Sequence, residues 1–253
     1  MHKKTGNVKK NRRIAFYGGS FDPAHNGHLT IARKLTELFA LDEFVFIPAF
    51  HAPHKKDKKP TSALHRFAML ALATSDKPKM RVSKTELDAP EKPYTYETQA
   101  KLKRKLSASE IFFVIGADSW QEIDTWREWE RVLTQTNIIV VTRPGSEIGF
   151  SHVTGKIRKR IVDYRKKVLS RKSQASSKVG KFEIGNGKTL DNESEKLGTW
   201  DLRLGTKIYI TDAVNLDVSS TEIRRKIRAS KTDWGKLVPR AVAKYIEKYE
   251  IYI

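Results

Sequence analysis

The 253-residue sequence contains no cysteine, so the chain can form no disulfide, use no thiolate nucleophile and bind no metal through sulfur. It also lacks an uninterrupted apolar run of the roughly eighteen residues that a membrane-spanning helix needs. Its first thirteen residues include six Lys or Arg side chains but no apolar stretch, which does not resemble a secretory signal. We therefore expect a cytoplasmic protein with no membrane partner.

Acidic side chains are outnumbered by basic ones, 29 to 49, which gives a formal net charge of +20. Much of this excess lies in two segments, with +6 in residues 1–13 and +8 in residues 151–206. Basic tails are usually solvated, and charge alone gives only a weak, salt-sensitive attraction to nucleic acid. We therefore expect no nucleic-acid partner, and we leave open whether the chain is a monomer or a homo-oligomer.

One stretch combines glycines, histidines and a proline directly after an apolar run. The run, residues 14–17, predicts a strand, and the apolar spacing of residues 29–39 predicts a helix. The residues between them read Gly18-Gly19-Ser20-Phe21-Asp22-Pro23-Ala24-His25-Asn26-Gly27-His28. A strand that ends in glycines and turns into a helix points backbone N–H groups at the open end of a parallel sheet, where α/β folds bind phosphates.

The two histidines of this stretch have the spacing of a shared helix face. His25 and His28 are three residues apart, so both imidazoles can donate to a phosphoryl group whose negative charge grows during transfer. A metal site that adds His51 and His54 is the alternative. It is disfavoured because no cysteine or correctly spaced carboxylate completes the ligand set, so we expect no protein-bound metal.

Alternating strand and helix patterns predict the fold of most of the chain. Helices are expected at residues 63–75, from residue 94 and at residues 239–249. Further strands are expected at residues 44–48, 80–83, 111–115, 138–142 and 207–211. This order predicts an α/β fold, a Rossmann-like doubly wound parallel sheet with helices on both faces.

Polar residues follow several of these strands and are expected to face one crevice. Lys55 lies in a loop after the second strand, where a solvated basic loop is the alternative. Gly116 and Asp118 follow the fourth strand; Asp118 can accept hydrogen bonds from ribose hydroxyls or simply cap a helix. Trp126 can stack on a heteroaromatic ring or pack in the core.

Residues 146–206 interrupt this pattern. They are basic and weakly hydrophobic, and lack enough apolar residues for a core of their own. We expect a partly disordered insertion in which Arg158 to Lys172 form one basic helix. The predicted division is a basic mobile tail at 1–12, one domain made of 13–145 and 207–253, and the insertion at 146–206.

A second helix start follows the last predicted strand. Ser219 and Glu222 have the spacing of a capping box, which is sufficient to explain these residues. The same segment would also present N–H groups, the hydroxyls of Ser220 and Thr221, and the Arg224 guanidinium to one anion.

These segments together resemble bacterial nicotinate-nucleotide adenylyltransferases, a branch of the nucleotidylyltransferase superfamily. The stretch from Gly18 to His28 matches the signature GG[S/T]FDPxHxGH, and Ser219 to Arg224 match SSTxIR. Between them lie, in the order of the family, Pro53-His54-Lys55, His65-Arg66, Tyr94-Thr95, Ile115-Gly116-Ala117-Asp118, Thr125-Trp126 and Arg143-Pro144-Gly145. The resemblance covers about residues 12–145 and 207–253.

The resemblance implies adenylyl transfer from ATP, with Mg²⁺, to nicotinate mononucleotide, which gives nicotinate adenine dinucleotide in NAD biosynthesis. It implies catalytic roles for His25, His28 and Arg224. The implied ATP-binding residues are Gly18, Gly19, Ser20, Phe21, His25, His28, Gly116, Asp118, Ser219, Ser220, Thr221 and Arg224. The implied residues for the mononucleotide are Lys55, Tyr94, Thr95, Asp118 and Trp126.

Two departures from the family pattern leave alternatives open. The segment 146–206 is longer than the connection found in most members, and Arg127 stands where many members have an aromatic residue. A related adenylyltransferase that prefers nicotinamide mononucleotide is therefore one alternative. A basic nucleic-acid-binding protein on a Rossmann-like scaffold is the other.

Overall fold

The computed structural model describes most of the chain. The described residues are 11–49, 61–89, 91, 93–142, 147–165, 205–214 and 218–253. All predicted strands lie within these ranges, whereas the tail at residues 1–10, the loop at 50–60 and residues 166–204 lie outside them.

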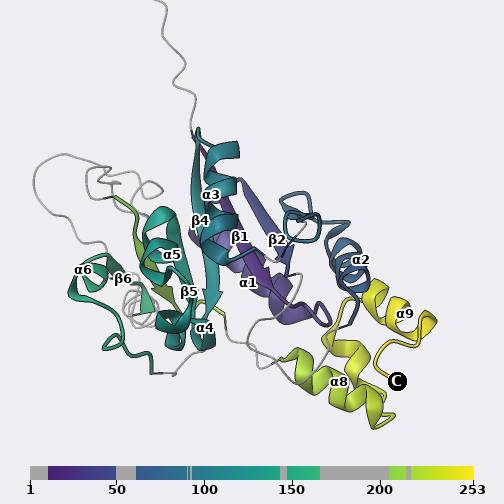
Figure 1. Ribbon diagram of the computed structural model, residues 1–253. Helices are drawn as coiled ribbons and strands as arrows, with labels where there is room; N and C mark the ends of the chain where they lie inside the picture. Colours follow the sequence, from purple (N-terminus) through teal and green to yellow (C-terminus); the bar gives the residue numbers. More distant parts are fainter. Residues whose placement is uncertain are drawn as a thin grey trace, which may run out of the picture.

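Seven parallel strands form a single sheet in the order β3-β2-β1-β4-β5-β7-β6 (Figure 1). Their bounds are β1 (Arg12–Gly19), β2 (Glu43–Pro48), β3 (Met80–Val82), β4 (Ser109–Gly116), β5 (Asn137–Val141), β6 (Ile161–Asp163) and β7 (Ile208–Thr211). The sheet confirms the α/β fold class and every strand that the apolar runs predict.

The chain reverses its direction of travel across the sheet between β1 and β4. It moves outward through β2 to β3, and then returns to β4 on the other side of β1 and continues to β5. In this register Tyr17 pairs with Val114 of β4, and Gly18 pairs with Ile47 of β2. Such a switch point opens a crevice outside the carboxyl ends of the two strands.

Helices cover both faces of the sheet, as predicted. They are α1 (Asn26–Leu38), α2 (Ala63–Thr74), α3 (Thr95–Lys105), α4 (Ala117–Gln121), α5 (Trp129–Gln135), α6 (Gly155–Arg158), α8 (Ser220–Arg228) and α9 (Arg240–Lys248), with 3₁₀ turns at η1 (Ile123–Thr125) and η4 (Asp233–Leu237). One core layer joins α1, α2, α8 and α9 to the sheet, and a second joins α3, α4, α5 and α6 to its other face. Figure 1 shows α9 beside α2.

Strand β1 supplies both layers because successive side chains point to opposite faces. Ala15 belongs to the layer under α1, whereas Ile14 and Phe16 belong to the opposite layer. Helix α1 buries Ala32 and Leu35 completely against the first layer. The helix begins at Asn26, three residues before the predicted start, so His28 lies inside its first turn.

The basic helix expected from Arg158 to Lys172 is wrong. Helix α6 ends at Arg158, and β6 then pairs in parallel with β7 at the edge of the sheet. Ile148, Val153 and Ile157 from the same region are buried in the second core layer. The apolar residues Ile161 and Val162 pair with β7, and this pairing determines the local structure despite the basic residues on either side. The division of the chain into tail, domain and insertion stays a prediction.

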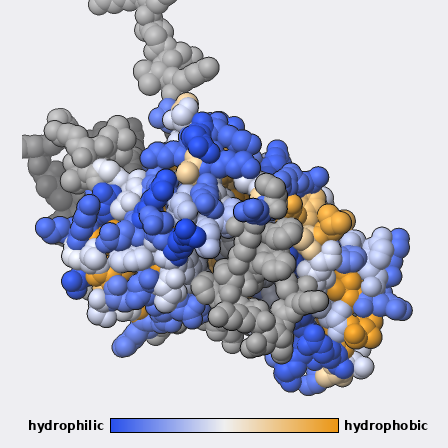
Figure 2. Space-filling model, viewed as in Figure 1, coloured by the Kyte–Doolittle hydropathy of each residue, from blue (hydrophilic) through white to orange (hydrophobic). Residues whose placement is uncertain are grey.

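The face shown in Figure 2 is largely hydrophilic, and a group of hydrophobic residues (orange) is exposed on the side where α2 and α9 lie. In α2 the side chains of Leu64 and Leu72 are exposed. Within the described ranges, the helices are all too short or too polar to cross a bilayer.

Candidate active site

The turn after β1 brings the ring of Phe21 against His28, the second histidine of the signature. Phe21 adopts a left-handed backbone with φ of 49°, and its side chain is buried. Its ring meets the His28 ring edge-on at 4.9 Å between centroids. A Cβ on Gly19 would approach the same ring to 3.0 Å, so the glycine is needed for this close packing.

His25 and His28 stack face to face, as their spacing predicts. Their ring centroids are 3.7 Å apart and the planes differ by 20°. The backbone N–H of His25 donates to Nδ1 of His28 over 3.2 Å. Nδ1 of His28 is therefore an acceptor, which leaves Nε2 to carry the proton in the neutral ring.

Burial keeps both imidazoles uncharged. Desolvation lowers the pKa of His25 to about 4. Desolvation, and secondarily the neighbouring His25, lower the pKa of His28 well below its ordinary value. Nδ1 of His25 is buried without a protein partner in the described structure. At neutral pH the pair can thus donate hydrogen bonds to a phosphate without carrying full charge.

Gly27, between the two histidines, is in close contact with the first of them. A Cβ at this position would lie 3.0 Å from both Cε1 and Nδ1 of His25. It would also approach Cβ of Val218, just before α8, to 3.8 Å. The signature glycine therefore permits the ring stack and the docking of α8.

The second motif docks directly onto the first. Ser219 caps α8, and its Oγ accepts the backbone N–H of Glu222 at 3.2 Å, which is one half of the expected capping box; the Glu222 carboxylate instead accepts from Arg225. The Ser220 hydroxyl donates to the carbonyl oxygen of Pro23 at 3.1 Å. Nη1 of Arg224 donates to the carbonyl oxygen of Asp22 at 2.5 Å, and Nη2 donates to Oγ1 of Thr221 at 3.3 Å. The N-terminal ends of α1 and α8 therefore meet at one place.

Asp22 holds this junction together, a role that the sequence reasoning did not assign. Its Oδ2 accepts the backbone N–H of Thr61 at 3.2 Å, and its Oδ1 accepts the Tyr252 hydroxyl at 2.6 Å. The buried Arg66 donates to the carbonyl oxygens of Ser20 and Thr61 at 2.9 Å each. Burial lowers the pKa of Arg66, and the charge of Asp22 opposes that shift.

The carboxyl end of β4 contributes an open glycine and an exposed carboxylate. A Cβ on Gly116 would meet no atom within 4 Å. Gly116 also precedes α4, where Asp118 is the second helical residue and therefore not its N-cap. Burial, and then the charge of Asp118, raise the pKa of Tyr17 to about 12, so this carboxylate lies near the end of β1.

Part of the set of residues expected for a second substrate forms another cluster, at the start of α3. Tyr94 precedes Thr95 at the start of α3, and the guanidinium carbon of Arg127 lies 4.7 Å above the Tyr94 ring. Trp126, beside Arg127, packs against the core layer under α3, α4 and α5. Arg127 therefore lies on an aromatic face at this cluster, a position the sequence left undecided. Lys55 lies outside the described residues.

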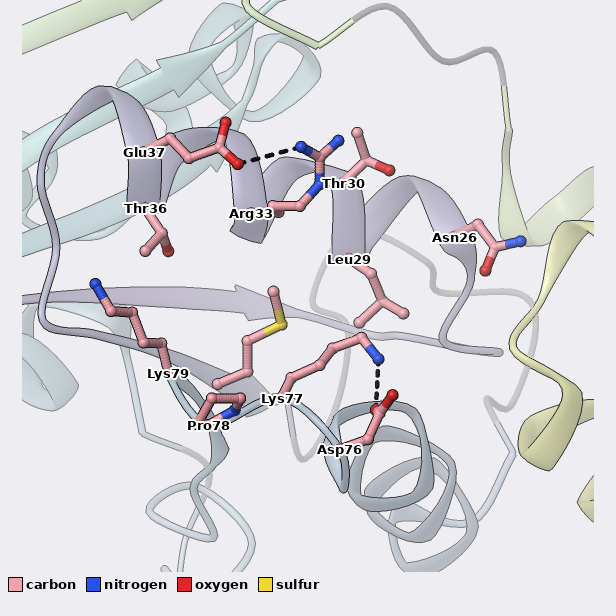
Figure 3. Close-up of a pocket in the computed structure, with 11 residues that line it drawn as sticks. Asn26, Leu29, Thr30, Arg33, Thr36, Glu37, Asp76, Lys77, Pro78 and Lys79 are labelled. Atoms are coloured by element: carbon pink, nitrogen blue, oxygen red, sulfur yellow. Dashed lines mark hydrogen bonds and ion pairs between the residues drawn. The ribbon is translucent and has the colours of Figure 1, made fainter.

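A groove of about 580 Å³ lies along the flank of α1 (Figure 3). Four of its charged side chains form two ion pairs, Arg33 with Glu37 at 3.2 Å and Lys77 with Asp76 at 2.5 Å, and Lys79 donates to the carbonyl oxygen of Leu41. Part of its wall is the turn that precedes β3, at the amino end of the strand. None of the predicted site residues lines it, so this groove is not the candidate active site.

The architecture and the docked motifs agree with a family comparison. A model of the cytidylyltransferase-like family matches residues 16–226, and the chain belongs to this family. Individual proteins that are similar to this chain have names that are more specific than the family description. A "Probable nicotinate-nucleotide adenylyltransferase" of Citrifermentans bemidjiense is 32% identical over 95% of this chain and 98% of its own. One of Thermoanaerobacter sp. (strain X514) is 30% identical over 97% of this chain and 96% of its own.

A solved structure supports the same fold. It is the nicotinic acid mononucleotide adenylyltransferase of Plasmodium falciparum, complexed with NaAD. The two chains superpose with a TM-score of 0.65 at 20% sequence identity, covering 96% of this chain and 98% of the other. This likeness extends over the whole α/β architecture.

Proposed function

We infer that this chain is a nicotinate-nucleotide adenylyltransferase that transfers the adenylyl group of ATP to nicotinate mononucleotide. The observation that carries the inference is the junction at the switch point of the sheet. There the stacked His25 and His28, the N-terminus of α8 and the Arg224 guanidinium converge at the carboxyl end of β1. The family membership and the names of the relatives support it.

In the proposed reaction, an oxygen of the mononucleotide 5′-phosphate attacks the α-phosphorus of ATP. A new P–O bond forms, the bond from the α-phosphorus to the bridging oxygen breaks, and pyrophosphate leaves with that electron pair. The attacking phosphate is already ionised, so the protein supplies no nucleophile. Its contribution is to position the two substrates and to stabilise the charge that develops on the phosphoryl oxygens.

ATP is proposed to lie over the carboxyl end of β1. Gly18, Gly19 and Gly116 allow its close approach to the backbone, and His28 donates from Nε2 to an α-phosphate oxygen. Arg224 and the N-terminus of α8 receive the β- and γ-phosphates. The remaining proposed contacts to ATP are those of Ser20, Phe21, His25, Asp118, Ser219, Ser220 and Thr221.

The mononucleotide is proposed to lie between this junction and the cluster at the start of α3. Trp126 stacks on its pyridine ring, and Tyr94 and Thr95 line the same subsite, with Asp118 toward the ribose and Lys55 near the phosphates. Mg²⁺ enters with ATP, since the phosphates supply the oxygen ligands that it prefers. Within the described ranges, His, Asp and Glu side chains form no group of three that could hold a metal. We place the reaction in the cytoplasm.

Incubation of the purified protein with ATP, Mg²⁺ and nicotinate mononucleotide tests this proposal. We expect nicotinate adenine dinucleotide and pyrophosphate in equal amounts, with neither product formed when the mononucleotide is omitted. The double variant His25→Ala, His28→Ala serves as the inactive control. Failure to form either product across a range of Mg²⁺ concentrations and pH would refute the enzyme assignment and favour the nucleic-acid-binding alternative.

A further inference from the structure

Three segments that are far apart in the sequence meet at the side chain and carbonyl group of Asp22. The start of α2 contributes the backbone N–H of Thr61, α8 contributes Arg224, and the turn after α9 contributes Tyr252. Asp22 itself is buried, with 7% of its surface exposed. A buried carboxylate must be hydrogen-bonded on both oxygens or countered by charge, and here Thr61 and Tyr252 each donate to one of the two oxygens.

The bond from Tyr252 is the shorter of the two bonds to the carboxylate. Its hydroxyl donates to Oδ1 at 2.6 Å, against 3.2 Å for the amide of Thr61 on Oδ2. Burial and the charge of Asp22 raise the pKa of the Tyr252 hydroxyl, so the group remains a donor throughout the neutral range. Ile251, the preceding residue, is buried in the first core layer and fixes the turn.

We propose that Tyr252 is a positioning residue for the adenylyl-transfer site, acting through Asp22 on the turn that precedes His25 and on Arg224. This inference rests on the proposed function. With Oδ1 of Asp22 engaged by Tyr252, the carboxylate is kept from Arg224, and the guanidinium bonds the Asp22 carbonyl oxygen instead. Arg224 thus stays available to an incoming polyphosphate.

Loss of the Tyr252 hydroxyl would release one carboxylate oxygen in a buried site. Arg224 already bonds the carbonyl oxygen of Asp22, so an ion pair between the two side chains would compete with ATP. The turn from Asp22 to His25 would also lose an anchor, and small displacements of reacting groups cost large factors in rate. Both effects act on ATP and on turnover, whereas the cluster at Tyr94 is untouched.

The test compares Tyr252→Phe with Tyr249→Phe, the same chemical change on a tyrosine that is half exposed and packs against Tyr245. For Tyr252→Phe we expect kcat to fall about tenfold and the Kd for ATP, measured without turnover by tryptophan fluorescence, to rise several-fold. KM for nicotinate mononucleotide should not change. Tyr249→Phe should match the unmodified chain in all three quantities.

A double-mutant cycle with Asp22→Ala, which removes both acceptor oxygens, shows whether Tyr252 acts through Asp22. If it does, adding Tyr252→Phe to Asp22→Ala lowers kcat by no more than about twofold. Full multiplication of the two single effects, or a Tyr252→Phe variant with unchanged kcat and ATP affinity, would overturn the proposal. An unmodified chain that binds ATP but makes no dinucleotide would instead refute the proposed function, while the ATP affinities would still report on Tyr252.

Discussion

The backbone N–H of His25 donates to Nδ1 of His28 over 3.2 Å, and this bond determines which nitrogen of the second imidazole carries a proton. With Nδ1 engaged as acceptor, Nε2 is the donor that remains for a ligand. The bond forms because α1 begins at Asn26 and places His28 in its first turn, above the backbone of its own N-cap residue. The backbone of His25 thus orients the His28 ring so that its Nε2–H can donate to a ligand.

We predict that His28→Ala lowers kcat by about 10²–10³ with little loss of folding, because it removes one donor to the developing charge. Steady-state rates with ATP and nicotinate mononucleotide measure the effect. His65→Ala is the matched control. His65 lies in α2, forms a hydrogen bond of 2.9 Å with the Tyr245 hydroxyl of α9, and takes no part in the proposed site. Turnover of His28→Ala within threefold of the control would rule out this role.

The buried histidines should make the folded state sensitive to acid. The pKa of His25 is about 4 when folded and about 6.5 when unfolded. Between these values the unfolded chain binds the proton and the folded chain does not, so stability is complete above pH 6.5 and declines as the pH falls toward 4. At pH 5 the free energy of unfolding should be lower than at neutral pH by roughly 2 kcal/mol through His25 alone.

Urea unfolding at pH 7 and pH 5 measures this effect. The unmodified chain should lose more free energy of unfolding over this interval than His25→Gln, whose side chain does not titrate. An equal loss in the two proteins would mean that His25 keeps its ordinary pKa in the folded state.

Gly27→Ala tests the contact between the glycine and the histidine stack. The new Cβ would stand 3.0 Å from the His25 ring, so the ring must move, and we expect kcat to fall about tenfold. The matched control is Gly155→Ala in the first turn of α6, where a Cβ would meet nothing within 4 Å. Equal kcat values for the two variants would show that the stacked geometry is not required.

Two variants should separate the substrate subsites. Arg224→Ala removes a charge-assisted donor, and we expect KM for ATP to rise about tenfold or more. Trp126→Ala removes an aromatic face, and we expect KM for nicotinate mononucleotide to rise roughly three- to tenfold. Initial rates with each substrate varied in turn measure both effects. The reverse pattern would mean that the two subsites are exchanged.

The sequence predicts most of the sheet because β1, β2, β4, β5 and β7 are apolar runs buried on both faces. It also predicts the meeting of His25 with His28, since residues three positions apart can share one face of a helix. Strand β6 was missed because only three residues, Ile161–Asp163, form it inside a basic segment.

Contacts across long distances in the sequence could not be predicted in this way. Tyr252 reaches Asp22 across 230 residues, and no local pattern marks either residue as the partner of the other. Arg66 is a partial exception. It lies in the first turn of α2, where a cation is unfavourable unless an anion is nearby, so the sequence indicates that an anion lies close to it. In the structure the charges of Asp22 and, to a smaller extent, Glu86 act on Arg66.

The ratio of kcat/KM for nicotinate mononucleotide to that for nicotinamide mononucleotide, with ATP and Mg²⁺ held constant, tests the central claim most directly. The backbone N–H groups of Thr95 and Tyr96, in the first turn of α3, have no partner within the helix and can bind the pyridine carboxylate, whereas the NH₂ of the amide would leave them unpaired. Arg127, whose guanidinium lies 4.7 Å from the Tyr94 ring, adds positive charge at the same cluster. We predict a ratio of at least ten in favour of the acid, which is about 1.4 kcal/mol in transition-state binding. A ratio of one or below would contradict the account and assign the chain to the dual-specificity or nicotinamide-preferring adenylyltransferases.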